Sequence, residues 1–167
     1  THAAYIHNAE ELPVLGSKTT GVLGALHFVR NPLDVCISYA HYSSLSIDES
    51  IDFMSRPLIS HGSNRATFIP ERILSWSEHV KSWSTASRDI DIKIIRYEDM
   101  LYTPSETFAR TGFTEKPKQA ARFFRKGVAG DWRATLSTDQ ISNVVEHHSE
   151  IMLAFNYLDH TGEPRLY

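Results

Sequence analysis

Residues 24–42 decide the fold, and they read Gly-Ala-Leu-His-Phe-Val-Arg-Asn-Pro-Leu-Asp-Val-Cys-Ile-Ser-Tyr-Ala-His-Tyr. The first part, 24–29, is a short and mostly apolar run of strand length. Asn31 is suited to cap a helix, and Pro32 to its first position, because the proline ring holds φ near the helical value. The pattern therefore predicts a strand over 24–29 and then a helix of about three turns that begins at Pro32.

Three further segments extend this pattern towards the carboxyl end. A long helix is predicted over 69–83, because apolar residues recur at spacings of 4, 3, 4 and 3 in Ile69, Ile73, Trp76, Val80 and Trp83. A second strand is predicted over 92–97, which is rich in β-branched residues. Ser137 and Gln140 form a capping box before a last helix that runs to Phe155. Strand, helix, helix, strand and helix in this order predict an α/β domain with a parallel sheet.

Composition limits the classes of protein to consider. The chain has 167 residues, of which 41% are hydrophobic and 22% charged, which suits a single globular domain over 1–167. No apolar run approaches the ~20 residues of a membrane-spanning helix, and residues 1–10 lack the basic cluster of a secretory signal. The single cysteine, Cys36, predicts a reducing, cytoplasmic location and a buried structural role. The net charge of −3 argues against a general nucleic-acid binder, and no spacing of Cys, His and Asp predicts a metal site.

The first segment with candidate chemistry surrounds Arg30. This residue follows the carboxyl end of a predicted strand, where open α/β sheets bind ligands, and the next helix directs its first N–H groups towards the same place. Ser38, nearly two turns into that helix, adds a hydroxyl donor. A surface arginine before a capped helix would show the same pattern, so this segment alone leaves both interpretations open.

The second such segment is 122–133, Arg-Phe-Phe-Arg-Lys-Gly-Val-Ala-Gly-Asp-Trp-Arg. Its arginines can bind phosphate through charged hydrogen bonds, and its glycines let backbone N–H groups converge on an oxyanion. Phe123 and Phe124 offer flat apolar faces on which a base can stack. A basic surface turn with two core phenylalanines is the alternative interpretation.

Together the two segments resemble the cytosolic-type sulfotransferase family, which transfers the sulfuryl group of 3′-phosphoadenosine 5′-phosphosulfate (PAPS). Residues 30–39 match the family's Arg-Asn-Pro-x-Asp-Val-x-x-Ser-Tyr, and 123–133 match its Phe-x-Arg-Lys-Gly-x-x-Gly-Asp-Trp-Lys except at Arg133. The stretches 75–83 and 97–100 are also similar and stand in the same order. The resemblance implies a P-loop NTPase-like three-layer α/β fold, and PAPS-dependent transfer to a hydroxyl or amine of a small-molecule acceptor without a metal.

The resemblance also assigns the cofactor contacts. Arg30 and Ser38 would bind the 3′-phosphate, and Tyr97 would contact the nucleotide, with a buried core tyrosine as the alternative. The loop over the same phosphate and the side chains beside the nucleotide would come from Arg125, Lys126, Gly127, Phe123 and Phe124. Glu98 and Asp99 follow Tyr97 and are either held in the turn after the strand or solvated.

His2 is the candidate catalytic residue. Thr1-His2 matches the end of the Lys-Thr-His that stands upstream of the arginine segment in the family, where the histidine is the general base. A neutral imidazole can accept the proton of the acceptor near neutral pH, because its ordinary pKa is about 6.5. A frayed, solvated terminal histidine is the alternative.

The chain departs from the family at several places. The 5′-phosphosulfate loop and the lysine before Thr1 are absent, so we expect a carboxyl-terminal portion of a longer polypeptide, with weak nucleotide binding and poor or no catalysis. A short interval before the second basic segment predicts a missing segment near 107–114. The family's dimer signature is not matched at the aligned positions, Arg133, Ser137, Thr138 and Ser142, so the oligomeric state stays open.

Two other functions remain open from the sequence. One is a nucleotide-binding relative that has lost catalysis, and the other is a small-molecule kinase of related fold, against which the missing Walker sequence argues. The expected partner is a small-molecule acceptor rather than nucleic acid or membrane. The identity of the acceptor is open, because the sequences of the expected pocket loops, 5–17 and 45–68, do not indicate a particular acceptor.

Overall fold

The computed structural model describes residues 24–60, 71–84, 91–111 and 128–165. In chain order its elements are β1 Gly24–Val29, α2 Pro32–Ser43, α3 Ile47–Ser55, β2 Leu58–Ser60, β3 Glu71–Ile73, α4 Trp76–Ser84, β4 Asp91–Arg96, α5 Tyr97–Tyr102, α6 Pro104–Thr111, α8 Trp132–Thr135 and α9 Thr138–Ala154. No helix in the described ranges is long and apolar enough to cross a membrane.

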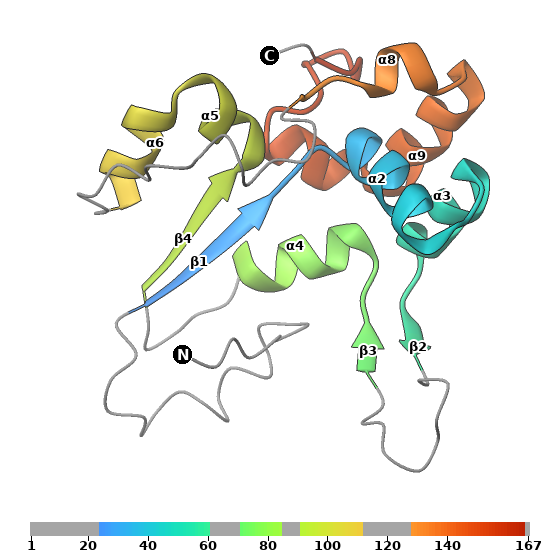
Figure 1. Cartoon of the computed structure of the whole chain (residues 1–167), viewed down its shortest axis with the longest axis horizontal. Helices are drawn as coiled ribbons and strands as arrows, with labels where there is room; N and C mark the ends of the chain where they lie inside the picture. The colour runs from blue at the N-terminus through green and yellow to red at the C-terminus, as the bar shows by residue number, and fades with distance from the viewer. Residues whose placement is uncertain (1–23, 61–70, 85–90, 112–127, 166–167) are drawn as a thin grey trace.

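The two longest strands form a parallel pair, as the sequence predicts. β1 and β4 are in register from Gly24 opposite Asp91 to Val29 opposite Arg96. Because the pair is parallel, both carboxyl ends lie at the same edge, where β1 leads into α2 and β4 leads into α5 (Figure 1). A second, antiparallel pair joins β2 and β3, with Leu58 opposite Ile73.

The helix after β1 is confirmed with its predicted start. The side chain of Asn31 accepts the N–H of Leu33, and Pro32 is the first helical residue. The helix ends at Ser43, and Ser44 takes a left-handed conformation with φ of 56°. The last predicted helix is also confirmed as α9, with the capping box of Ser137 and Gln140 fully formed.

The prediction of one helix over 69–83 is wrong in its first half. Residues 71–73 form β3, and α4 begins only at Trp76. Ser75 explains this boundary, because its hydroxyl accepts the N–H of Glu78 while Glu78 accepts the N–H of Ser75. The expected loop over 45–68 likewise contains α3, which has its own capping box of Ser46 and Glu49.

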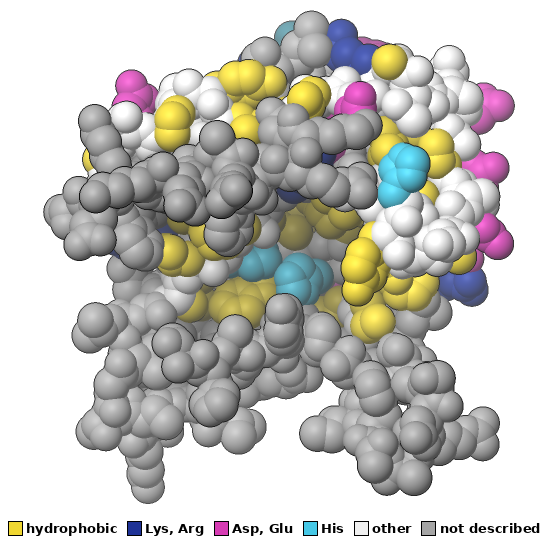
Figure 2. Space-filling view, viewed as in Figure 1, with side chains coloured by type: hydrophobic (Ala, Val, Ile, Leu, Met, Phe, Trp, Pro, Cys, Tyr) yellow, Lys and Arg dark blue, Asp and Glu magenta, His cyan; other side chains and the backbone are white. Residues whose placement is uncertain are grey.

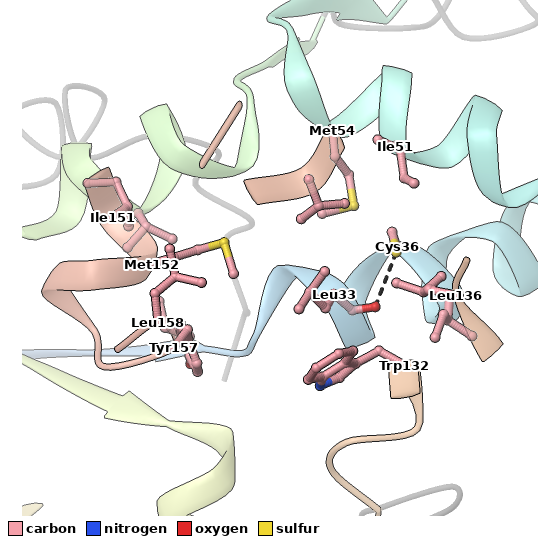
Figure 3. Close-up of a cluster of buried hydrophobic side chains, with 14 residues drawn as sticks. Leu33, Cys36, Ile51, Met54, Trp132, Leu136, Ile151, Met152, Tyr157 and Leu158 are labelled. Atoms are coloured by element: carbon pink, nitrogen blue, oxygen red, sulfur yellow. Dashed lines mark hydrogen bonds between the residues drawn. The ribbon is translucent and has the colours of Figure 1, made fainter. Parts of the chain in front are cut away.

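The hydrophobic core lies mainly between α2, α3 and α9, and it also includes Val29 at the end of β1, Val80 of α4 and Trp132 of α8 (Figure 3). Its largest fully buried members include Leu33, Ile51, Met152 and Tyr157. Helix α9 packs against α2, α3 and α4, so it covers the core along most of its length. Cys36 is buried among these residues and burial raises the pKa of its thiol to about 12, as expected for a structural cysteine.

Candidate functional site

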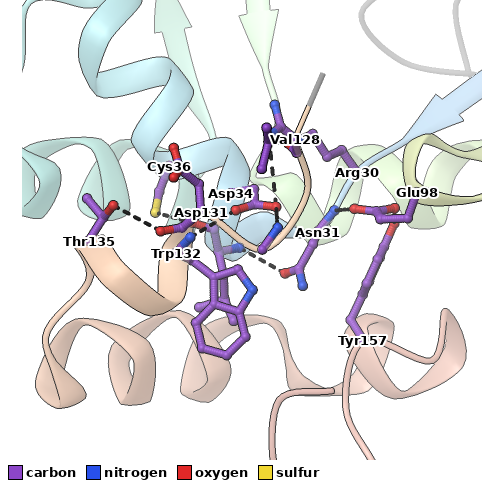
Figure 4. Close-up of polar contacts among 12 residues, drawn as sticks. Arg30, Asn31, Asp34, Cys36, Glu98, Val128, Asp131, Trp132, Thr135 and Tyr157 are labelled. Atoms are coloured by element: carbon purple, nitrogen blue, oxygen red, sulfur yellow. Dashed lines mark hydrogen bonds and ion pairs between the residues drawn. The ribbon is translucent and has the colours of Figure 1, made fainter. Parts of the chain in front are cut away.

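Arg30 lies directly after β1, at the edge where the two parallel strands end. Its guanidinium carbon is 4.6 Å from the centre of the Tyr97 ring, which follows β4. Nη2 donates to the carbonyl oxygen of Val128 at 3.3 Å and lies 3.8 Å from Oδ2 of Asp34 (Figure 4). The buried Nε has no hydrogen-bond partner among the described residues. The site therefore holds a cation with an unused donor, as an anion-binding site requires.

Asp34 joins the two segments in which the sequence places candidate chemistry. Its carboxylate is fully buried and accepts two backbone N–H groups, that of Gly130 at 2.8 Å on Oδ2 and that of Trp132 at 3.1 Å on Oδ1. Gly130 lies 96 residues further along the chain. The described end of the second basic segment, 128–132, is thus held against the turn between β1 and α2.

Glu98 is a second buried carboxylate beside the site. Oε1 accepts the N–H of Asn31 at 2.9 Å, and Oε2 accepts the hydroxyl proton of Tyr157 at 3.0 Å (Figure 4). Burial raises the pKa of Glu98, although these hydrogen bonds oppose the shift. The solvated alternative for Glu98 is therefore wrong. Its carboxylate connects the strand-end turn, the residue after Arg30 and the carboxyl-terminal region.

The other described candidates are Ser38 and Tyr97. Ser38 is exposed on α2, one turn after Asp34 and on the same face of the helix. Tyr97 is the first residue of α5 rather than the last of the strand, and its half-buried ring lies under the guanidinium of Arg30. Burial raises the pKa of Tyr97, against the opposing charge of Arg30. Arg30, Tyr97 and the Asp34–Ser38 face of α2 thus belong to one edge of the molecule.

Six candidate residues lie outside the described residues: His2, Phe123, Phe124, Arg125, Lys126 and Gly127. Their assignments as general base, nucleotide contacts and phosphate-closing loop stay predictions.

A cluster of aromatic rings lies between β1 and α4. His27 stacks on Trp83 with ring centres 5.1 Å apart and lies 5.2 Å from His79. Burial, with His79 nearby, lowers the pKa of His27 to about 4, so this ring is neutral near neutral pH. Trp76 packs against the core and contacts the rings of His148 and Tyr157. Both tryptophans therefore make contacts within the protein, as expected for residues of α4.

An apolar pocket of about 160 Å³ lies beside this cluster. It is lined from α2, α3, α4 and the end of β3, with Tyr39 and Phe53 stacked at 4.8 Å and His79 among its polar groups. On the face shown in Figure 2, histidine and hydrophobic side chains lie together in a hollow. Such a lining suits a mostly apolar molecule with few polar groups.

Comparison with known proteins identifies the class. The model of the sulfotransferase domain family matches residues 25–119, more than half of the chain. The chain therefore belongs to the sulfotransferase domain family.

A solved member shows the same fold. The crystal structure of mouse sulfotransferase SULT7A1 complexed with PAP superposes with a TM-score of 0.52 at 19% sequence identity. The match covers 83% of this chain and 61% of that one, so this chain spans less than two thirds of its relative. The predicted α/β fold, with a parallel sheet flanked by helices as in P-loop-like sulfotransferases, is confirmed.

Proposed function

We propose that this chain is the portion of a PAPS-dependent sulfotransferase that binds the 3′ end of the nucleotide and contributes to sulfuryl transfer. The observation that carries the proposal is the position of Arg30: it stands at the common carboxyl edge of β1 and β4, over the Tyr97 ring, with a buried Nε that has no partner among the described residues. Family membership and the PAP complex of the similar mouse protein support the choice of ligand.

The described residues fit a phosphorylated nucleotide. Arg30 would bind the 3′-phosphate through its guanidinium, with the hydroxyl of Ser38 as a further donor from the adjacent helix. Tyr97 would contact the nucleotide from the other strand end. The remaining contacts would come from Phe123, Phe124, Arg125, Lys126 and Gly127, as the family resemblance implies.

PAPS supplies the sulfuryl group and leaves as 3′-phosphoadenosine 5′-phosphate (PAP). His2 would accept the proton from the attacking hydroxyl or amine, which makes that atom a better nucleophile. Arg30 would orient the nucleotide, because binding of the 3′-phosphate positions the 5′-phosphosulfate for the reaction. No metal is required by this scheme. The apolar pocket beside His79 is the proposed acceptor site, and its size and lining favour a small, largely apolar acceptor.

Calorimetric titration of the complete polypeptide with PAP, and with adenosine 5′-phosphate as comparison, tests the proposal. We expect PAP to bind more tightly, and Arg30→Ala to reduce that preference by about 1.5–3 kcal/mol, because a hydrogen bond to a charged group is lost. Arg56→Ala is the matched control, since Arg56 is exposed directly after α3 and pairs only with Asp52 among the described contacts. Equal weakening of both nucleotides by Arg30→Ala would contradict the assignment of Arg30 to the 3′-phosphate.

Turnover separates this function from its alternatives. Release of PAP from PAPS in the presence of an acceptor panel would establish catalysis. Tight PAP binding without turnover would indicate a nucleotide-binding relative that has lost catalysis. A preference for a nucleoside triphosphate with magnesium over PAP would indicate a kinase.

A further inference from the structure

Asp34 makes more contacts than a simple counter-ion for Arg30 would make. Its carboxylate is fully buried, and both oxygens accept backbone N–H groups from residues 130 and 132. The same Oδ2 lies 3.8 Å from the guanidinium of Arg30, which in turn donates to the carbonyl of Val128. Arg30, Asp34 and the backbone of 128–132 therefore form a closed set of contacts, in which each member restrains the other two.

We propose that Asp34 is a positioning residue for the anion site: it fixes the backbone of 128–132 and the guanidinium of Arg30 relative to each other, so that Arg30 is held ready for the 3′-phosphate. The inference rests on the proposed function, since it concerns the ligand assigned to Arg30. Asp34 itself does not contact the nucleotide in this arrangement.

Electrostatics and positioning predict opposite effects when the charge of Asp34 is removed. A carboxylate 3.8 Å from a guanidinium partly cancels its positive charge. If Asp34 were only a counter-ion, Asp34→Asn would make the site more positive and strengthen binding of phosphate. If Asp34 positions the site, the variant loses one acceptor for a buried N–H and directs an amide NH₂ group at it, so the site loosens and binding of the 3′-phosphate weakens.

Gly130 offers a second way to disturb the same set of contacts without changing any charge. Its φ is +91°, a conformation that L side chains rarely adopt, and an added Cβ would meet no atom within 4 Å. Gly130→Ala therefore strains the backbone at the N–H that Asp34 accepts, and creates no steric clash.

The carboxyl-terminal turn supplies matched controls for both variants. Asp159 also accepts two backbone N–H groups, from Thr161 and Glu163. Gly162 has a φ of +89° and likewise no atom within 4 Å of an added Cβ. Asp159→Asn and Gly162→Ala therefore repeat the same chemical changes in a turn whose hydrogen bonds to described residues do not involve Arg30 or residues 128–132.

The experiment measures, for the complete polypeptide and each variant, the ratio of the affinities for PAP and adenosine 5′-phosphate by calorimetry. We expect Asp34→Asn and Gly130→Ala each to lower this ratio about tenfold, the size of effect that follows from one hydrogen bond to a charged group. Asp159→Asn and Gly162→Ala should leave the ratio unchanged. The ratio is independent of protein stability, because a partly unfolded population lowers the apparent affinity for both nucleotides by the same factor.

An unchanged or increased ratio in Asp34→Asn would overturn the inference. If that variant does not fold, as judged by thermal unfolding, Gly130→Ala decides alone, and an unchanged ratio there has the same meaning. A wild-type protein with no preference for PAP would overturn the proposed function together with the inference. A wild-type preference that survives both variants would overturn the inference alone.

Discussion

Two buried carboxylates, Asp34 and Glu98, organise the surroundings of Arg30 by accepting N–H groups of the backbone. Each acid therefore replaces water as the partner of groups that would otherwise be buried without hydrogen bonds. Glu98 also accepts the hydroxyl proton of Tyr157, so the residue after Arg30 is tied to the carboxyl-terminal region. At this scale the charges serve to hold the chain in place as much as to bind a ligand.

Two buried histidines predict an acid-sensitive fold. Burial lowers the pKa of His27 and His148 to about 4 from the ordinary value of 6.5. The unfolded chain therefore binds more protons than the folded one in this interval, and stability is lost as the pH falls from 6.5 towards 4. Glu98 acts in the opposite sense, because its raised pKa favours the folded state as the pH falls towards the ordinary value of 4.5.

The measurement is urea unfolding across that pH interval. We expect His148→Gln to reduce the loss of unfolding free energy on acidification, since one buried imidazole no longer has to be charged. His41→Gln is the control, because His41 is exposed on α2 and is not a neighbour of His148 in the chain. Equal pH dependence in wild type and His148→Gln would contradict the prediction.

Elements with strong local signals are the ones that the sequence predicts correctly. β1, α2, β4 and α9 follow from apolar runs, a proline at the first helical position and capping residues. The sequence prediction misplaces the start of α4, because an apolar periodicity of helical spacing runs through β3, although Ser75 and Glu78 mark the true start. Short elements such as β2, β3, α5 and α6 depend on what they pack against and carry weak signals of their own.

The capping box of α9 is expected to contribute measurably to stability. Ser137 accepts the N–H of Gln140, so Ser137→Ala should lower the free energy of unfolding by about 1 kcal/mol. Ser142→Ala is the control, because Ser142 is exposed within the same helix and caps nothing there. Urea titration checks both variants, and an equal effect of the two would show that the cap is unimportant.

At the scale of the whole molecule, three distant parts of the chain meet beside Arg30. They are the turn after β1, the junction of β4 with α5, and residues 128–132. The parallel pairing of β1 with β4 brings the first two together, and the N–H groups that Asp34 accepts hold the third. Helix α2, which carries Asp34, also contributes Leu33 and Cys36 to the hydrophobic core (Figure 3).

Tyr157 tests how strongly the carboxyl-terminal region is coupled to this edge. Tyr157→Phe keeps the ring contacts but removes the hydroxyl donor of the buried Glu98, so the free energy of unfolding should fall by about 1–3 kcal/mol. Tyr42→Phe should change it by less than about 0.5 kcal/mol, because Tyr42 is 88% exposed. A Tyr157→Phe variant as stable as Tyr42→Phe would mean that the hydrogen bond contributes little.

The sequence by itself determined the class of protein, the strands β1 and β4, and the helices α2 and α9. It also placed Arg30 and Tyr97 at the ends of those strands. These features depend on residues close together in the chain, or on motifs whose order can be read directly. Only the tertiary structure decided what surrounds Arg30. Asp34 meets backbone groups 96 and 98 residues away, and Glu98 meets Tyr157 at a separation of 59. No local pattern encodes such contacts, because they arise only when the paired strands and the packed helices bring these segments together.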